Sequence, residues 1–321
     1  MSSGPGREES LTTVSSQAGQ KGPRCEAREK PTSEGVLKEY VGARRSSATK
    51  QMGLFGRPAE GPVERLDHDP TSPWWGIHLA RYMFASPYAS NRRTLDIACG
   101  TGYGLPQLQA RARCVVGVDL DREAVRAARA ELNSAAGGVL VADGGALPFK
   151  KKRFELITSF ETLEHLKHRK EFLAELSRVL SRDGLCILST PNANRTLPVN
   201  GTPRNPHHLH EYTPAELEKE LRSCFAEVEL MGQTLDRRFI IPPFWEEQRQ
   251  LPSSPQVQLQ LLLWRVLNKL PFRLRERLSQ LVWDHPFLPR ESDYHFSSSA
   301  VETAPVLVAL CSRLNREFIG K

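Results

Sequence analysis

The chain has 321 residues, enough for one large domain with extensions or for two small domains. Hydrophobic residues make up 39% and charged residues 25%, as in soluble globular proteins, and no apolar run approaches the length of a membrane span. The net charge of +7 is modest and spread over many Lys and Arg residues, so we expect no nucleic-acid partner.

The six cysteines show no C-x-x-C pairing. They are Cys25, Cys99, Cys114, Cys186, Cys224 and Cys311. Four of them lie in or beside predicted core strands. This pattern predicts buried free thiols and a cytoplasmic location, because free thiols persist in a reducing compartment.

The N-terminal stretch 1–59 is rich in Ser, Gly, Pro, Lys and Glu and has no sustained periodicity. It predicts a mostly disordered tail. Its scattered glutamates argue against a transit peptide, which would be poor in acids. Residues 60–321 are predicted to form the folded domain.

An apolar stripe from Trp74 to Ala89 predicts a helix that packs on a sheet. His78 and Arg81 are polar positions on this helix. Two interpretations stay open for them: they face a ligand, or they are solvated.

A glycine-rich turn follows the short apolar stretch Thr94–Ala98, which predicts a buried strand. Gly100 and Gly102 allow a tight turn and the close approach of a ligand, and 105–111 then predicts a helix. The spacing G-x-G-x-G differs from the dinucleotide fingerprint G-x-G-x-x-G. Asp96, four residues before the first glycine, suits a ligand with an amino group better than a pyrophosphate.

A second acid, Asp119, ends the predicted strand 114–119 about 20 residues after the turn, where a ribose-binding acid is expected. Strands alternate with helices through the rest of the chain. The further predicted strands are 139–142, 154–160, 184–190, 226–232 and 305–311. This alternation predicts a doubly wound, mostly parallel α/β sheet.

The order D-x-x-C-G-T-G-x-G followed by V-G-V-D resembles the first motif of class I S-adenosylmethionine-dependent methyltransferases. The resemblance implies a Rossmann-like sheet of seven strands. It also implies that 305–312 is the final, antiparallel strand and that 233–300 is a helical insertion or lid before it.

The same resemblance implies S-adenosylmethionine as the cofactor. Asp119 would bind the ribose and Asp143 the adenine, while Asp96 would hold the amino end of the methionine part. The residues expected at the cofactor are Arg81, Asp96, Ala98, Gly100, Gly102, Asp119, Leu120, Asp143, Gly144 and Phe160.

After the predicted fourth strand comes an E-x-x-E-H pattern formed by Glu161, Glu164 and His165. It resembles the O-methyltransferases of ubiquinone synthesis and bacterial saccharide-type methyltransferases. In one helical turn these side chains would share a face. They would hold a divalent ion such as Mg²⁺ or supply a general base, or the acids would only favour the start of a helix.

After the predicted fifth strand, an N-P-x-H-x-x-E-Y segment resembles the substrate-side loop of the saccharide-type enzymes, with His208 and Glu211 at the matching positions. His207 and His210 are additional, and H-H-x-H is not a typical zinc spacing. From the two resembling segments, the catalytic base is expected among Glu161, Glu164, His165 and His208.

The stretch 257–282 is leucine-rich and basic, and Pro271 divides it into two helices. We favour a lid or a dimer face that buries the leucines. The alternative is a helix pair on a membrane surface, with Arg side chains toward anionic lipid.

The resemblances together imply methyl transfer to a small-molecule hydroxyl, such as that of a sugar, a glycolipid, a phenol or a quinone. Two alternatives stay open: N-methylation of a small molecule, and a non-catalytic protein that binds the cofactor.

Overall fold

The computed structural model describes residues 69, 71–132, 137–244, 248 and 251–314, which all belong to the unit 31–321. The predicted tail 1–59 and Cys25 lie outside the described residues. The five described cysteines are all free and buried, as expected. Within the described residues, no helix combines the length and apolarity that a membrane span requires.

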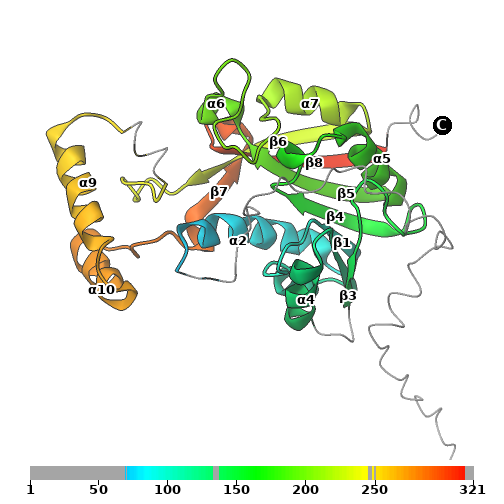
Figure 1. The fold of residues 1–321 in the computed structure, drawn as a ribbon, viewed down its shortest axis with the longest axis horizontal. Helices are drawn as coiled ribbons and strands as arrows, with labels where there is room; N and C mark the ends of the chain where they lie inside the picture. The colour runs from blue at the N-terminus through cyan, green and yellow to red at the C-terminus, as the bar shows by residue number, and fades with distance from the viewer. Residues whose placement is uncertain (1–68, 70, 133–136, 245–247, 249–250, 315–321) are drawn as a thin grey trace, which may run out of the picture. The chain divides into compact units, whose positions relative to one another are not determined.

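The described residues form one sheet of eight strands in the order β3-β2-β1-β4-β5-β8-β6-β7 (Figure 1). The strands are β1 (Arg93–Ile97), β2 (Cys114–Asp119), β3 (Gly137–Val141), β4 (Phe154–Phe160), β5 (Leu180–Pro191), β6 (Phe225–Leu235), β7 (Tyr294–Ser297) and β8 (Val306–Leu314). Strands β1 to β5 pair in parallel, while β8 pairs antiparallel with both β5 and β6. The predicted doubly wound, mostly parallel fold is confirmed.

The sheet has one strand more than predicted. Strand β6 continues to Leu235, beyond the predicted end at residue 232, and its last four residues pair antiparallel with β7. This short strand comes from the segment predicted as a helical insertion. The alternation of apolar residues in Tyr294–Ser297 is too short to have indicated a strand on its own.

Helices cover both faces of the sheet, as doubly wound topology requires (Figure 1). The helices around the sheet are α2 (Pro73–Ala85), α3 (Leu105–Gln109), α4 (Arg122–Glu131), α5 (Arg169–Val179), α6 (Ala193–Thr196) and α7 (Pro214–Arg222). Short 3₁₀ turns are η1 (Ser86–Ala89), η2 (Leu163–His165), η3 (Glu291–Asp293) and η4 (Ser298–Ala300).

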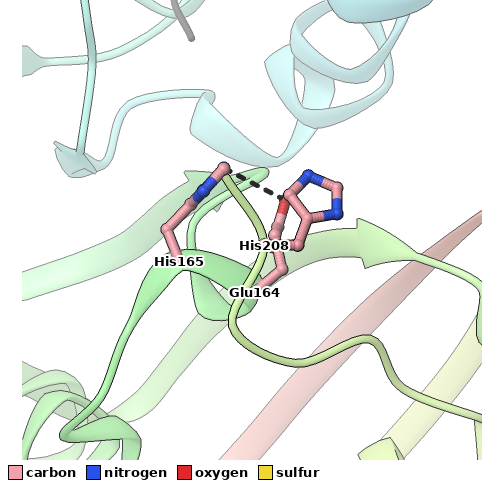
Figure 2. A group of neighbouring side chains, drawn as sticks. All are labelled: Glu164, His165 and His208. Carbon is pink, nitrogen blue, oxygen red and sulfur yellow. Dashed lines mark ion pairs between the residues drawn. The ribbon is translucent and has the colours of Figure 1, made fainter. Parts of the chain in front are cut away.

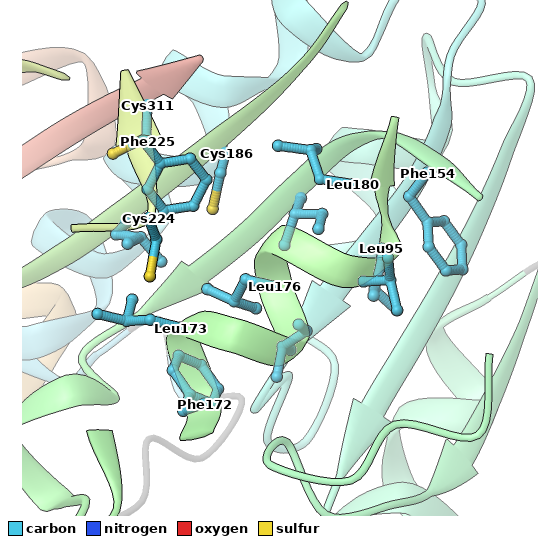
Figure 3. Packing of buried hydrophobic residues seen from close by; sticks show 14 of the residues in the cluster. Leu95, Phe154, Phe172, Leu173, Leu176, Leu180, Cys186, Cys224, Phe225 and Cys311 are labelled. Carbon is cyan, nitrogen blue, oxygen red and sulfur yellow. The ribbon is translucent and has the colours of Figure 1, made fainter. Parts of the chain in front are cut away.

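Two apolar clusters join these helices to the sheet. On one face, Leu173 and Leu176 of α5 are fully buried against β-strand residues such as Leu95 and Cys186 (Figure 3). On the other face, Tyr82 of α2 packs in a cluster with residues of α3 and α4. The sheet between the two clusters therefore has the near-continuous apolar character of a parallel sheet covered on both sides.

The segment between β6 and β7 contains helices α9 (Pro255–Leu267) and α10 (Phe272–Trp283), which meet at the predicted break at Pro271. Only Leu261 on α9 and Ser279 on α10 are buried. Several of the leucines expected to be buried are exposed in this structure, for example Leu259 and Leu262. The rest of the described chain does not cover them, and a lid or a dimer face stays a prediction.

Candidate active site

The glycine turn after β1 has the backbone that its sequence predicts. Gly100 and Gly102 have φ angles of +55° and +82°, in the left-handed region that glycine adopts without strain. A Cβ at Gly100 would meet no atom within 4 Å, whereas one at Gly102 would lie 2.6 Å from the Cβ of Ala128. Gly100 therefore leaves room for a ligand, and Gly102 lets the turn pack closely on α4.

Asp119 ends β2 beside this turn. Its carboxylate accepts hydrogen bonds from the N–H of Gly100 at 2.8 Å and from the N–H of Asp121 at 2.9 Å. The next residue, Leu120, is 47% exposed. An acid and an apolar side chain thus lie together at the accessible end of β2, an arrangement that suits a ribose and an adjoining flat base.

Asp143 occupies the corresponding place after β3. Its carboxylate accepts a hydrogen bond from the N–H of Gly145 at 2.8 Å, and partial burial raises the pKa of the carboxyl above its usual value. Asp143, Gly144 and Asp119 are all partly accessible, and Ala98 is exposed. Since β1, β2 and β3 are parallel, these residues share one edge of the sheet.

Asp96 lies deeper, where it is 1% exposed. Its two carboxylate oxygens accept hydrogen bonds from the hydroxyls of Tyr82, at 3.0 Å, and Thr158, at 2.7 Å. Burial raises the pKa of the Asp96 carboxyl to about 7, although both hydrogen bonds oppose the rise. Phe160 packs edge-on against Tyr82, with ring centroids 4.9 Å apart.

Arg81 is also buried, at 1% exposure, which excludes the solvated interpretation for this residue. Its Nε donates to the side-chain oxygen of Gln233 at 2.8 Å, and its Nη1 lies 3.4 Å from a carboxylate oxygen of Glu161. His78 lies 3.3 Å from the same Nη1. Burial and the charge of Arg81 lower the pKa of His78 well below its usual value.

The E-x-x-E-H residues do not form the single group that one helical turn would give. Glu161 precedes η2 with a φ of +49°, and it accepts a hydrogen bond from the hydroxyl of Ser189 at 2.8 Å. Glu164 and His165 lie within η2. The Glu161 carboxylate lies beside Arg81 and Ser189, and Glu161 is not a member of the group of possible metal ligands that contains Glu164 and His165.

The loop after β5 supplies His208, which joins Glu164 and His165 in one group. Figure 2 shows His165 and His208 on either side of Glu164. The two imidazole rings meet edge-on with centroids 5.0 Å apart, and His165 Nε2 lies 3.9 Å from Glu164 Oε1. Glu164, His165 and His208 each offer one ligand atom within 4.8 Å of the others.

Backbone contacts hold this grouping together. The carbonyl oxygen of Glu164 accepts hydrogen bonds from the N–H groups of Leu209, at 2.7 Å, and His210, at 3.2 Å. His165 Nδ1 lies 3.0 Å from the carbonyl oxygen of His207, so Nδ1 carries the proton and Nε2 the lone pair.

His208 and Glu211 form a carboxylate–imidazole pair, with Nδ1 and Oε1 2.7 Å apart. Glu211 is 6% exposed and also accepts a hydrogen bond from Thr196. Burial would raise the pKa of Glu211, but the hydrogen bonds from His208 and Thr196 outweigh it and lower the pKa. His208 Nε2 lies 3.0 Å from the side-chain nitrogen of Asn205.

Glu164 has a buried carboxylate oxygen that lacks a hydrogen-bond partner. It is fully buried; its Oε2 accepts from the hydroxyl of Thr190 at 3.0 Å, whereas its Oε1 has no hydrogen-bond partner. Burial, followed by the negative charge of Glu161, raises its pKa well above the usual value. A buried oxygen in this state costs free energy unless a ligand satisfies it.

Sequence reasoning missed several polar contacts at the site: Tyr82, Thr158, Gln233 and Thr190. Thr158 and Thr190 are polar residues within apolar predicted strands, which is a usable signal. Tyr82 was only part of an apolar stripe, and Gln233 lay beyond the predicted end of its strand. Neither residue carried a distinguishing pattern.

Comparisons with known proteins show which family this chain resembles. Residues 95–188 match the family described as a methyltransferase domain. A probable S-adenosylmethionine-dependent methyltransferase of Mycobacterium tuberculosis is 32% identical over 188 residues, which are 58% of this chain and 67% of that protein. A ubiquinone biosynthesis O-methyltransferase of Thiobacillus denitrificans is 27% identical over 186 residues, 52% of this chain and 80% of that protein.

Among solved structures, the YcgJ protein of Bacillus subtilis aligns with a TM-score of 0.43 at 18% identity, over 74% of this chain and 99% of that chain. The family match and the Mycobacterium relative establish the class. The chain belongs to the class I S-adenosylmethionine-dependent methyltransferases; it is an enzyme whose cofactor is S-adenosylmethionine.

Replacing Asp119 by Ala is expected to weaken S-adenosylhomocysteine binding by about 1.5–3 kcal/mol, because a charged hydrogen-bond acceptor is lost. Isothermal titration calorimetry measures the affinity. Asp183→Ala, which removes an exposed carboxylate before the apolar part of β5, is the matched control and should bind as the parent does. Unchanged affinity in folded Asp119→Ala would refute the role of this acid.

The pKa of Asp96 predicts a pH dependence of stability. Its folded-state pKa of about 7 exceeds the unfolded value of 3.8, so the folded state binds the proton more tightly. The free energy of unfolding of the cofactor-free protein should therefore fall as pH rises through this window, by about 1.4 kcal/mol per pH unit. Urea unfolding of the parent and of Asp96→Asn at about pH 5 and pH 8 isolates this contribution. Equal pH dependence in both proteins would contradict the assignment.

Proposed function

We propose that this enzyme transfers the methyl group of S-adenosylmethionine to a hydroxyl of a small molecule, with His208 as the general base. The observation that carries the proposal is the pairing of His208 with buried Glu211 at 2.7 Å, beside His165 and Glu164. This group follows β4 and β5, at the edge of the sheet where parallel α/β proteins bind ligands.

The bound cofactor would supply an activated methyl group on a sulfonium. The residues of the chain would then align the acceptor, exclude water and remove the proton from the hydroxyl. Asp119 and Asp143 would hold the ribose and the adenine. Asp96 would hold the amino end of the methionine part, and Arg81 its carboxylate.

His208 suits proton removal because its tautomer is defined. The carboxylate of Glu211 accepts from Nδ1, which leaves the lone pair on Nε2, the nitrogen that faces the donor amide of Asn205. A substrate hydroxyl would replace that amide. As the oxygen–methyl bond forms and the carbon–sulfur bond breaks, the hydroxyl proton would pass to Nε2, and Glu211 would stabilise the resulting imidazolium.

A hydroxyl acceptor is favoured over an amine by two observations. A hydroxyl loses its proton only at high pH, so it needs the base that His208 and Glu211 would provide. One relative carries the name of a ubiquinone biosynthesis O-methyltransferase. A small-molecule amine acceptor, or cofactor binding without turnover, is the alternative.

The buried free thiols also support the cytosol as the proposed location.

A divalent metal ion is the second candidate for this cluster, because Glu164 Oε1 is buried without a hydrogen-bond partner. The ligands would be Glu164, His165 and His208 rather than the predicted set with Glu161. One carboxylate and two imidazoles suit Mn²⁺ or Zn²⁺ better than Mg²⁺, which prefers oxygen ligands. The ion would then lower the proton affinity of the acceptor hydroxyl.

Replacing His208 by Ala is expected to lower kcat by about 10²-fold or more, the usual effect of removing a positioned proton acceptor. The affinity for S-adenosylhomocysteine should not change, because His208 faces the acceptor side. His207→Ala is the matched control: its exposed side chain lies in the same loop, while the carbonyl that contacts His165 is retained.

The assay uses labelled cofactor and a library of sugars, glycolipids, phenols and amines. EDTA distinguishes the two versions of the chemistry. A metal site loses activity on chelation and regains it with Mn²⁺ or Zn²⁺, whereas a general base does not respond. Turnover at the parental rate in His208→Ala would refute the base, and cofactor binding without turnover of any acceptor would favour the non-catalytic alternative.

A further inference from the structure

Helices α9 and α10 expose an unusual amount of apolar surface. Sixteen large apolar side chains are exposed among the described residues, and half of them lie on these two helices. They are Leu259, Leu262, Leu263, Val266, Phe272, Leu274, Leu281 and Val282, each at least 41% exposed. A concentration of this kind on two neighbouring helices marks an interaction surface.

All of these exposed residues except Phe272 form a stripe on their helix. On α9, residues 259, 262, 263 and 266 have the spacing i, i+3, i+4 and i+7, which places them on one face. On α10, residues 274, 281 and 282 have the spacing i, i+7 and i+8. Both helices are therefore amphipathic, but with an apolar side that is accessible.

The opposite sides of the helices are already used within the chain. Trp264 stacks on the ring of Phe287 with centroids 5.1 Å apart, and Leu261 is 5% exposed. Glu276 accepts a hydrogen bond from the N–H of Phe287 at 3.2 Å, and Arg275 lies over the same ring. These contacts show which sides of the helices face the rest of the chain, and the apolar stripes lie on other sides.

Basic side chains border the stripes. Between residues 255 and 283 the chain has five basic residues and one acidic residue, Glu276, whose carboxylate is engaged by Phe287. Arg265, Lys269, Arg273 and Arg277 are exposed. At about 100° per residue, Arg265 falls beside the apolar stripe of α9, and Arg273 and Arg277 fall on one side of the stripe of α10. Lys269 lies in the turn between the two helices. Apolar side chains bordered by exposed cations are the pattern of helices that lie in the surface of an anionic bilayer.

We propose that α9 and α10 form a membrane-docking surface that binds bilayers containing anionic lipid. The apolar stripes would enter the boundary between headgroups and acyl chains. The four exposed cations would contact the anionic headgroups. This inference rests on the surface of the helix pair and does not depend on the identity of the methyl acceptor.

Charge favours a bilayer over a second copy of the chain. In a two-fold symmetric dimer through this surface, the same patch would face itself. The exposed cations of one copy would then approach those of the other, and like charges in an interface are unfavourable. An anionic membrane complements the same charges.

The test measures binding of the full chain to vesicles by flotation. Binding is expected to vesicles of three parts phosphatidylcholine to one part phosphatidylglycerol, and to be much weaker with phosphatidylcholine alone or in high salt. Arg273→Gln/Arg277→Gln should weaken binding by about tenfold or more. Leu262→Gln/Val266→Gln should also weaken it by about tenfold or more, because the lost apolar groups no longer enter the bilayer.

Two controls make the result specific. Arg122→Gln/Arg126→Gln on α4 changes the net charge by the same amount at exposed sites outside the helix pair, and Met83→Gln removes an exposed apolar side chain from α2. Both should bind vesicles as the parent does. Equal weakening by the α4 variant would overturn the proposal in favour of non-specific attraction. Absence of vesicle binding, together with a dimer that Leu262→Gln/Val266→Gln dissociates, would overturn it in favour of self-association.

Discussion

The carbonyl oxygen of Glu164 is the contact on which the acceptor side of the site depends. It accepts the N–H groups of Leu209 and His210, which joins the turn after β4 to the loop after β5. These segments are more than 40 residues apart in the sequence. The contact of His165 Nδ1 with the carbonyl oxygen of His207 joins the same two segments. Together these contacts place His208 against His165, and the proposed acceptor side depends on them.

The proposed cofactor side combines accessible and buried acids. Asp119 and Asp143 are accessible at the ends of β2 and β3, whereas Asp96 is enclosed by Tyr82 and Thr158. Helix α2 carries both Tyr82, which donates to Asp96, and Arg81, which donates to Gln233 and lies close to Glu161.

Much of the fold follows from local sequence patterns. Strands β2 and β4 have the predicted bounds, because apolar runs ended by turn residues are strong signals in a parallel sheet. The glycine turn and the acid that ends β2 were also predictable. Strand β7 was not, since its four residues are defined by pairing with the extended end of β6.

The candidate site was predictable in its residues but not in its grouping. Glu164, His165 and His208 were all singled out by their motifs, yet helical spacing placed Glu161 with the first two. Glu161 instead has a left-handed backbone and lies before the turn that holds the other two residues, and no local sequence pattern indicates this. In the same way, the leucine pattern of α9 and α10 predicted amphipathic helices correctly. It could not specify whether the chain itself covers their apolar sides.

The most direct test of the proposed chemistry is the pH dependence of single-turnover methyl transfer in the parent enzyme and in Glu211→Gln. If His208 is the base and Glu211 stabilises its protonated form, the variant should reach half of its maximal rate at a lower pH than the parent, and its maximal rate should be lower. A variant with the same midpoint and the same rate as the parent would contradict the account.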